Sequence, residues 1–422
     1  MLIDHRALFA PLTKGSYRLA PGAVAAGLEQ AASLAISEPP GPVFLELPED
    51  VAVAEATEPD APLPRAAPQR DAPDDLPARV SALLENARHP LVVAGLTFTR
   101  SRHPERLARF CQRHAIPFVT TLHAKGFIPE SLPGALGVMG RARRTDVARA
   151  IAGADLILAV GFDPVEIDYE DWGGETPVAH LSTEPVQPGT GITLAYQGVG
   201  GMDALLEALE AIPTRENGWD PTQWTAHQEA LDAALRPDIT GFAAHQALDV
   251  LRERLPADAI LAYDVGAHTH QIATQWRTDV PHTAVATNGW SSMGYGMPAA
   301  YAAKLVHPER PVVGVVGDGC FQMTAGELAT AARLGLRAPL VVLDDGWLGL
   351  MKLKQERGGY GHSGVVLGER VPPPAHYFGV PVRAAHDPAS FADALEWALA
   401  QEGPSVIWAV IDVEGYSATV FD

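Results

Sequence analysis

The sequence predicts an α/β protein that contains two doubly wound parallel sheets. Short apolar runs typical of buried strands alternate with segments of helical period, the order in which helices join parallel strands. This alternation occurs in two blocks, and 422 residues are enough for two or three domains. Residues 54–78 are dense in Pro, Ala and acidic residues and are predicted to form an extended linker before the first block. A weaker seam at 212–240 separates the two blocks.

The first block contains four apolar runs of strand length. The predicted strands are LVVAGL, IPFVTTL, ADLILAVG and TPVAHLST, at 91–96, 116–122, 154–161 and 176–183. Two segments between them, 104–115 and 144–154, have the spacing of amphipathic helices. This pattern predicts a parallel sheet with helical connections.

The second block repeats the pattern. Its predicted strands are AILAYDVG, TAVATNG, PVVGVVGDG, APLVVLDDG and PSVIWAVIDV, at 259–266, 283–289, 311–319, 338–346 and 404–413. Its predicted helices are 292–306 and 324–336. Ahead of the linker, 21–37 predicts one helix and GPVFLELPEDV at 41–51 predicts one strand, which together are too little for a domain.

Charge and cysteine content narrow the function classes. The formal net charge of −20 disfavours binding to nucleic acid or to an anionic membrane surface. The only two cysteines, Cys111 and Cys320, lack the spacing of a zinc site or a disulfide framework, which favours a reducing cytoplasm. Neither a secretory leader nor an apolar run of membrane-spanning length is present, so we expect a soluble cytoplasmic protein.

An acid between two glycines ends one predicted strand and opens a helix-like segment. Ligands of open parallel sheets lie beyond the carboxyl ends of strands, where Gly317, Asp318 and Gly319 fall. The glycines let a phosphate approach the backbone, and the N–H groups of Gly319, Cys320 and Phe321 could point at it. A lone turn of this kind is a weak signal, since many strand-to-helix turns resemble it.

A second acidic turn raises the specificity of the signal. Asp345 ends the next predicted strand, 27 residues after Asp318, and that length fits a helix followed by a strand. Two carboxylates at adjacent strand ends could share one hard cation such as Mg²⁺ with phosphate oxygens.

GDG followed 27 residues later by Asn or Asp resembles the signature of thiamine diphosphate (ThDP) enzymes. The surroundings resemble the acetolactate synthase branch over nearly the whole chain, and GFDPVEIDYEDW and Asp345 resemble its catabolic, FAD-free type. The other resembling segments are HRALFAPLTKGSYRLA, GPVFLELPEDV, YDVGAHTH, NGWSSMGYGMPAAYAAKLVHPER, GDGCFQMTAGELATAARLGL and DDGWLGLMKLKQE.

The resemblance implies a set of cofactor ligands. Asp318, Asp345 and the backbone carbonyl of Trp347 would hold Mg²⁺. Many family members have Asn where this chain has Asp345, and the additional charge is expected to tighten the metal site. The implied ThDP-binding residues are Gly266, Ala267, His268, Ser291, Met293, Gly317, Asp318, Gly319, Cys320, Asp345, Trp347, Leu348 and Gly349.

Three of the implied residues would act near the reacting atoms. Met293 would support the bent form of ThDP, although a Met in a glycine-rich helix start is more often core. Ser291 would offer its carbonyl to the 4′-amino group, and Gln355 could face the substrate. His268 would contact the diphosphate, with a polar loop histidine as the alternative.

The resemblance also implies an incomplete catalytic unit. Residues 1–70 would be the end of a pyrimidine-binding domain plus linker, 71–215 a central domain, and 236–422 the diphosphate-binding domain. The glutamate that activates ThDP has no candidate position in this sequence. We therefore expect a split enzyme, a heterotetramer in which a separate polypeptide supplies the pyrimidine-binding domain with that glutamate. A shortened gene product and a non-catalytic relic are the alternatives.

The implied reaction is decarboxylation of a small 2-oxo acid, with pyruvate as the expected donor. The resulting enamine would then be ligated to a carbonyl acceptor. A ThDP-dependent 2-oxo acid decarboxylase or aldehyde lyase would use the same cofactor frame. A nicotinamide dehydrogenase is disfavoured because no G-x-G-x-x-G follows a strand with an acid downstream. An inactive regulatory or scaffold subunit remains the alternative of another class.

Overall fold

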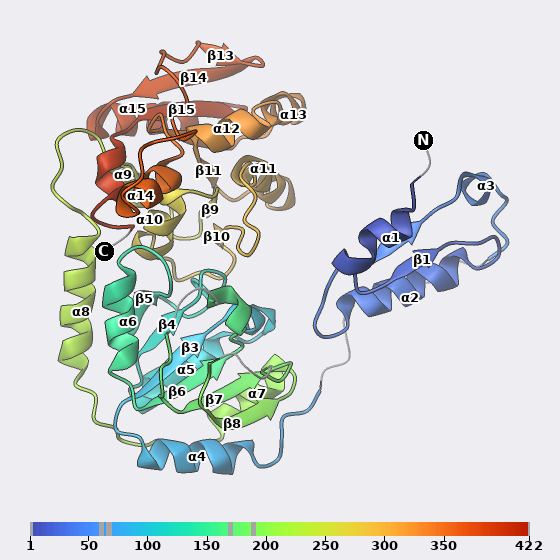
Figure 1. Ribbon diagram of the computed structural model, residues 1–422, viewed down its shortest axis with the longest axis vertical. Coiled ribbons are helices and arrows are strands. Elements are labelled where there is room, and N and C mark those ends of the chain that lie inside the picture. The colour runs from blue at the N-terminus through green and yellow to red at the C-terminus, as the bar shows by residue number, and fades with distance from the viewer. Residues whose placement is uncertain (1–2, 59–62, 65–69, 168–171, 187–190, 421–422) are drawn as a thin grey trace.

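The computed structural model describes residues 3–58, 63–64, 70–167, 172–186 and 191–420. Two large sheets, one above the other in Figure 1, carry helices on their faces. This arrangement confirms the predicted α/β class with parallel sheets. Segments 59–62 and 65–69 of the predicted linker, and 168–171 within GFDPVEIDYEDW, lie outside the described residues.

Residues 3–58 form a small unit to one side of the two large sheets (Figure 1). A two-stranded parallel sheet is its centre, and Glu38 at the end of the unit's longest helix accepts hydrogen bonds from Arg100 and Thr183 of the next block. The helix and strand predicted here are confirmed. The elements are α1 His5–Phe9, η1 Ala10–Leu12, β1 Ser16–Arg18, α2 Val24–Ile36, β2 Phe44–Glu46 and α3 Glu49–Ala52.

The central sheet has six parallel strands in the order β5-β4-β3-β6-β7-β8. The four predicted strands are confirmed as β3, β4, β6 and β7, and the two edge strands were not predicted. The strands are β3 Pro90–Ala94, β4 Phe118–Thr120, β5 Ala135–Val138, β6 Leu156–Val160, β7 Val178–Ser182 and β8 Leu194–Val199. The helices are α4 Leu76–Asn86, η2 Leu96–Arg100, α5 Glu105–His114, α6 Arg144–Ala152, η3 Pro164–Ile167 and α7 Met202–Glu210.

Two helices occupy segments that the sequence assigned to a linker and a seam. Helix α4 begins at Leu76, inside the predicted linker, because Leu76 is completely buried in the apolar cluster under the sheet. Helix α8, Pro221–Ala234, fills about half of the predicted seam and is capped by Asp220, whose side chain accepts the Thr222 N–H. Its Trp224 is buried against the central sheet. The seam is therefore a packed helix.

The C-terminal sheet has seven strands in the order β10-β9-β11-β12-β15-β14-β13, with only β13 antiparallel to its neighbour. All five predicted strands are confirmed; β13 and β14 were not predicted. The strands are β9 Ile260–Tyr263, β10 Ala284–Val285, β11 Val312–Gly317, β12 Pro339–Asp344, β13 His376–Tyr377, β14 Val380–Ala385 and β15 Ser405–Val410. The helices are α9 Ala244–Arg254, α10 Ala267–Gln275, α11 Gly296–Val306, α12 Asp318–Thr324, α13 Glu327–Leu334, α14 Gly349–Arg357, α15 Pro388–Leu399 and η4 Val413–Tyr416.

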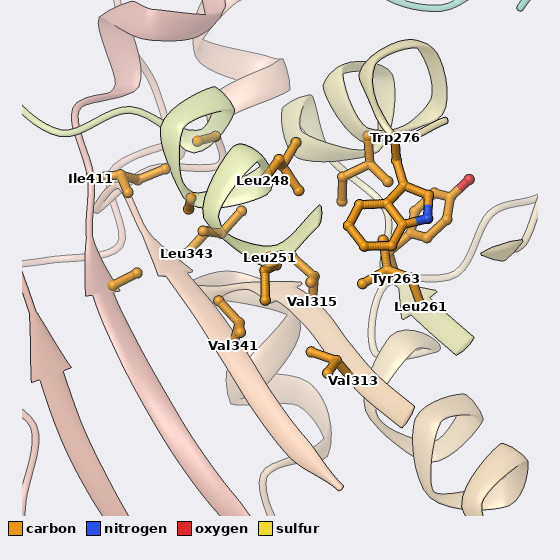
Figure 2. Packing of buried hydrophobic residues seen from close by; sticks show 14 of the residues in the cluster. Leu248, Leu251, Leu261, Tyr263, Trp276, Val313, Val315, Val341, Leu343 and Ile411 are labelled. Atoms are coloured by element: carbon orange, nitrogen blue, oxygen red, sulfur yellow. The ribbon is translucent and has the colours of Figure 1, made fainter. Parts of the chain in front are cut away.

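Strands β11 and β12, which end at the acidic turns, are held in place by a buried apolar core. Leu248 and Leu251 of α9 pack over Val313 and Val315 of β11 and over Val341 of β12 (Figure 2). Each of these side chains is at most 2% exposed, and burial of one such side chain contributes about 1.5–3 kcal/mol. The ends of β11 and β12 therefore leave the sheet from well-determined positions.

A buried ion pair joins the two large blocks. The ammonium group of Lys125 contacts both carboxylate oxygens of Glu130 at 2.8 and 2.7 Å, and the Lys125 side chain is fully buried. Glu130 also accepts the Thr278 N–H at 2.8 Å, so the pair anchors the loop after β4 to the segment after α10. No helix among the described residues has the length and apolar content to span a bilayer.

Candidate functional site

The acidic turns meet at one edge of the C-terminal sheet. Strands β9, β11 and β12 are parallel neighbours, with Val315 beside Tyr263 and Gly317 beside Leu343. Their carboxyl ends therefore share an edge, and the chain order reverses between β9 and β11. Such a reversal is where open α/β sheets bind ligands.

Asp318 connects the turn after β11 to the turn after β12. One of its carboxylate oxygens accepts the Gly346 N–H at 2.8 Å, and the other accepts the Gly319 N–H at 2.8 Å. Asp345 accepts the Trp347 N–H at 2.8 Å. We expected the Gly319 N–H to face a phosphate, but in the structure it donates to Asp318, because this carboxylate folds back over the start of α12.

The ionised forms of the Asp318 and Asp345 carboxyl groups are unfavourable in the fold without a cation. Burial, followed by the charge of Asp345, raises the pKa of Asp318 to about 8. Burial raises the pKa of Asp345 to about 7. A divalent cation would stabilise both ionised carboxylates, and hard cations prefer such oxygen ligands.

The acid pair alone does not complete a metal site. In the part of the chain that the structure describes, no cluster of three or more His, Cys, Asp or Glu side chains is arranged for a metal ion. Asp318 and Asp345 would therefore need oxygens from the backbone and from a ligand. The Trp347 backbone carbonyl is a candidate for this additional ligand. It belongs to the turn that the Asp345 side chain holds by its hydrogen bond to the Trp347 N–H.

His268 fits a diphosphate. It lies in the first turn of α10, is 5% exposed, and its Nε2 atom has no hydrogen-bond partner among the described residues. Burial lowers the pKa of His268 to about 4, although the charge of Asp264 and a hydrogen bond between the ring and the Asp264 backbone oppose this shift. A phosphate anion beside Nε2 would favour the protonated ring, which donates from both nitrogens. A Cβ at Gly317 would lie 3.2 Å from the His268 ring, so a side chain there would crowd the ring.

Met293 lies over the same turn. A Cβ at Gly319 would lie 3.2 Å from the Met293 Cε and 3.0 Å from a Leu348 methyl group. Ser291, two residues before Met293, has a φ of 46°, an unusual backbone conformation for a residue with a side chain. Such conformations of residues other than glycine cluster at functional sites.

The start of α14 closes the other side of the acid pair. A Cβ at Gly349 would lie 2.8 Å from the Asp345 carboxylate and 3.7 Å from the Ala267 Cβ. Ala267 and Gly266 precede His268, so α10 and α14 begin beside each other. The structure thus brings together the predicted residues of three strand ends, namely Gly266, Ala267, His268, Met293, Gly317, Asp318, Gly319, Cys320, Asp345, Leu348 and Gly349.

Gln355 is not directed at this cluster. Its carboxamide donates to the Ser363 carbonyl at 3.1 Å and accepts the Ser363 N–H at 3.2 Å. The side chain therefore pins the loop that follows α14, which is the role the structure supports.

Sequence analysis missed two acids at the same edge. Asp264, which ends β9, is 1% exposed and accepts backbone N–H groups of Gly294 and Gly296. Asp344 accepts the Trp408 indole N–H at 2.8 Å. An acid at the end of a predicted strand was the signal at Asp318 and Asp345, and the same signal is present at Asp264.

A larger hollow lies elsewhere. It has a volume of about 1180 Å³ and is at the carboxyl edge of the central sheet, beside Arg100, Trp172 and His180. A smaller one, about 760 Å³, borders Asp345 and Trp347. Of the candidate-site residues, this hollow is lined by Asp345, Gly346 and Trp347 but not by Asp318 or His268. We therefore place the site by its acids and by the unpaired His268 nitrogen, because size alone identifies no chemistry.

Two family models match the chain in the same places as the two sheets. Residues 78–209 match the model of the thiamine pyrophosphate enzyme central domain. Residues 264–409 match the model of the C-terminal, thiamine pyrophosphate-binding domain. The chain therefore belongs to the thiamine pyrophosphate enzymes, and ThDP (the same compound) with Mg²⁺ is the expected cofactor.

Within this family the chain is similar to acetolactate synthase large subunits. It is 28% identical over 365 residues to that of Corynebacterium glutamicum, covering 83% of this chain and 58% of the relative. It is 29% identical over 364 residues to that of Lactococcus lactis, covering 84% and 63%. A probable acetolactate synthase large subunit of Methanocaldococcus jannaschii is 27% identical over 437 residues, covering 97% and 73%. The chain thus spans about three fifths of the first two relatives.

Proposed function

We propose that this chain is the large subunit of a split acetolactate synthase-like enzyme. It decarboxylates a 2-oxo acid, with pyruvate as the donor, and joins the remaining carbon unit to a carbonyl acceptor. One observation carries the proposal. Two buried carboxyl groups, Asp318 and Asp345, and the His268 Nε2, which has no hydrogen-bond partner among the described residues, lie where the chain order reverses between β9 and β11. The buried thiols of Cys111 and Cys320 support action in the cytoplasm.

Different residues would bind the metal ion, the diphosphate and the organic part of the cofactor. Asp318, Asp345 and the Trp347 carbonyl would hold Mg²⁺, and His268 would donate to a diphosphate oxygen. The Ser291 carbonyl and the Met293 side chain would bind the organic part of the cofactor. When bound, ThDP supplies the carbon nucleophile and the electron sink for decarboxylation.

We also propose that a separate polypeptide completes the site with a pyrimidine-binding domain and its glutamate, in a heterotetramer. The loop at the site supports this part of the proposal. Trp290, next to Ser291, is fully exposed, and Met323, 61% exposed, packs near Gly294. Large apolar side chains in that position are typical of a surface that a partner covers.

The N-terminal unit offers a second such surface. Its sheet has only the strands β1 and β2, which is too small to be stable alone. Five large apolar side chains on the unit are exposed: Ile3, Leu8, Leu12, Leu47 and Val53. A pyrimidine-binding domain in the partner could extend the sheet and cover these side chains.

The test is ThDP- and Mg²⁺-dependent pyruvate consumption by the full chain, alone and co-expressed with a polypeptide that carries the pyrimidine-binding domain. Activity only with the partner, and its loss in Asp318→Ala, is the expected result. CO₂ release without a ligated product would favour a decarboxylase or lyase. No activity and no ThDP-induced thermal shift in either sample would overturn the catalytic proposal and favour a scaffold subunit.

A further inference from the structure

One buried carboxylate binds two segments of the candidate site together. Asp264 follows β9, and one of its oxygens accepts the N–H groups of Val265 at 2.8 Å and Gly294 at 3.1 Å. The other oxygen accepts the Gly296 N–H at 2.7 Å. Hydrogen bonds to an ionised acceptor are stronger than neutral ones, and here they are shielded from water.

The first segment that Asp264 fixes leads to His268. The Asp264 carbonyl accepts a hydrogen bond from the Thr269 hydroxyl, in the first turn of α10. The Cys320 thiol donates to the Val265 carbonyl at 3.1 Å, which ties the same peptide to the turn after β11. The start of α10, and with it His268, is therefore held relative to Asp264.

The second segment carries Ser291 and Met293. It runs into Gly294 and Gly296, which the Asp264 carboxylate holds by their N–H groups. A Cβ at Gly296 would lie 2.8 Å from the Asp264 nitrogen, so this segment is in direct backbone contact with the end of β9. Nothing else among the hydrogen bonds of the described residues joins Asp264's loop to residues 294–296.

We infer that Asp264 is a positioning residue that sets the separation between the diphosphate-binding side of the site, at His268, and the side that binds the organic part of the cofactor, at Ser291 and Met293. The inference rests on the proposed function. Asp264 itself touches neither a metal ligand side chain nor the reacting atoms. Its contribution is to present two half-sites at one distance, so that a ligand long enough to reach both binds without reordering the loop.

Asp264→Asn tests this directly. The Asn oxygen can still accept from Val265 and Gly294, but its NH₂ group would face the Gly296 N–H, so one charge-assisted bond becomes a donor–donor contact. We expect ThDP to bind about ten- to a hundredfold more weakly in excess Mg²⁺. Inorganic pyrophosphate reaches only the diphosphate side, so its affinity with Mg²⁺ should change less than about threefold.

The measurement is calorimetric titration of the full chain with each of these two ligands. Asp258→Asn, an exposed acid just before the same strand, is the matched control and should leave both affinities unchanged. If Asp264→Asn does not fold, Gly296→Ala is the second variant. Its added methyl group would press on the Asp264 backbone and displace the same segment, so it should cause the same selective loss of ThDP affinity.

Loss of ThDP affinity with retained pyrophosphate affinity supports the inference. Equal losses for both ligands would overturn it, because they would indicate general destabilisation, and so would unchanged binding of both. Failure of the wild-type chain to bind either ligand, both alone and together with the polypeptide that carries the pyrimidine-binding domain, would instead overturn the proposed function, and this inference with it.

Discussion

The carboxylate of Asp318 and the N–H of Gly346 form a 2.8 Å hydrogen bond, although 28 positions separate the two residues in the sequence. This bond joins the turns after β11 and β12 directly. The acid that we assign to the metal therefore also determines where the turn that carries Asp345 lies.

Asp318→Asn should weaken Mg²⁺ binding more than any other single change at this edge. Asn keeps an acceptor for Gly346 but removes the charge, so we expect a loss of at least about thirtyfold in Mg²⁺ affinity. Titration with Mg²⁺ in the presence of ThDP measures it. Asp258→Asn, an exposed acid before β9 and away from this edge, is the control; equal losses in both variants would contradict a specific role for Asp318.

Asp345→Asn should move stability and metal affinity in opposite directions. The pKa of Asp345 is raised to about 7 by burial, so above that pH its charge destabilises the metal-free fold. We expect removal of this charge to raise the free energy of unfolding by about 1–2 kcal/mol at pH 8 and to weaken Mg²⁺ binding about tenfold. Thermal unfolding with and without Mg²⁺ measures both effects. A variant that is less stable without metal would refute this account.

Metal-induced stabilisation should increase with pH. An unfolded carboxyl has a pKa near 4, whereas in the fold burial raises the pKa of Asp318 to about 8 and that of Asp345 to about 7. Between about pH 4 and 8 the folded, metal-free chain thus holds more protons than the unfolded chain, and its stability falls as pH rises. Mg²⁺ requires the ionised groups, so its effect on the melting temperature should grow from pH 6 to pH 8. A constant or shrinking effect would argue against metal binding at these acids.

Lys125→Met should destabilise the contact between the two large blocks. It leaves the Glu130 carboxylate buried without its cation, and breaking a buried pair in this way typically costs about 3–5 kcal/mol. The double variant Lys125→Met, Glu130→Gln should recover most of the loss, because Gln still accepts the Thr278 N–H. Urea unfolding of both variants measures this. If the double variant is no more stable than the single one, the pair does not act as described.

Sequence patterns predicted the strands buried on both faces but missed β5, β8, β13 and β14. Strands β3 and β6 are apolar runs of five buried residues, and β12 is such a run followed by Asp344, so each is easily recognised in the sequence. Strand β14, VPVRAA, is half exposed and contains both Pro and Arg, so no continuous run marks it. Helix α8 was hidden because only Trp224 and Leu231, seven residues apart, are buried in its fourteen residues.

The candidate site was predictable where side chains supply the chemistry. Asp318, Asp345 and His268 are marked by residue type and by their place at strand ends, and the structure brings them to one edge. Asp264 was missed because its partners are backbone N–H groups about thirty residues away, which any residue except proline would supply. Gln355 was assigned to substrate because its hydrogen bonds to Ser363 depend on a loop conformation that the sequence does not reveal.

The most direct test of the account is calorimetric titration of the full chain with ThDP, with and without Mg²⁺, repeated on Asp318→Ala. We predict one ThDP site per chain that requires Mg²⁺ and is lost in the variant. ThDP binding that persists without Mg²⁺, or that Asp318→Ala retains, would contradict the assignment of the acid pair and His268 as the cofactor site.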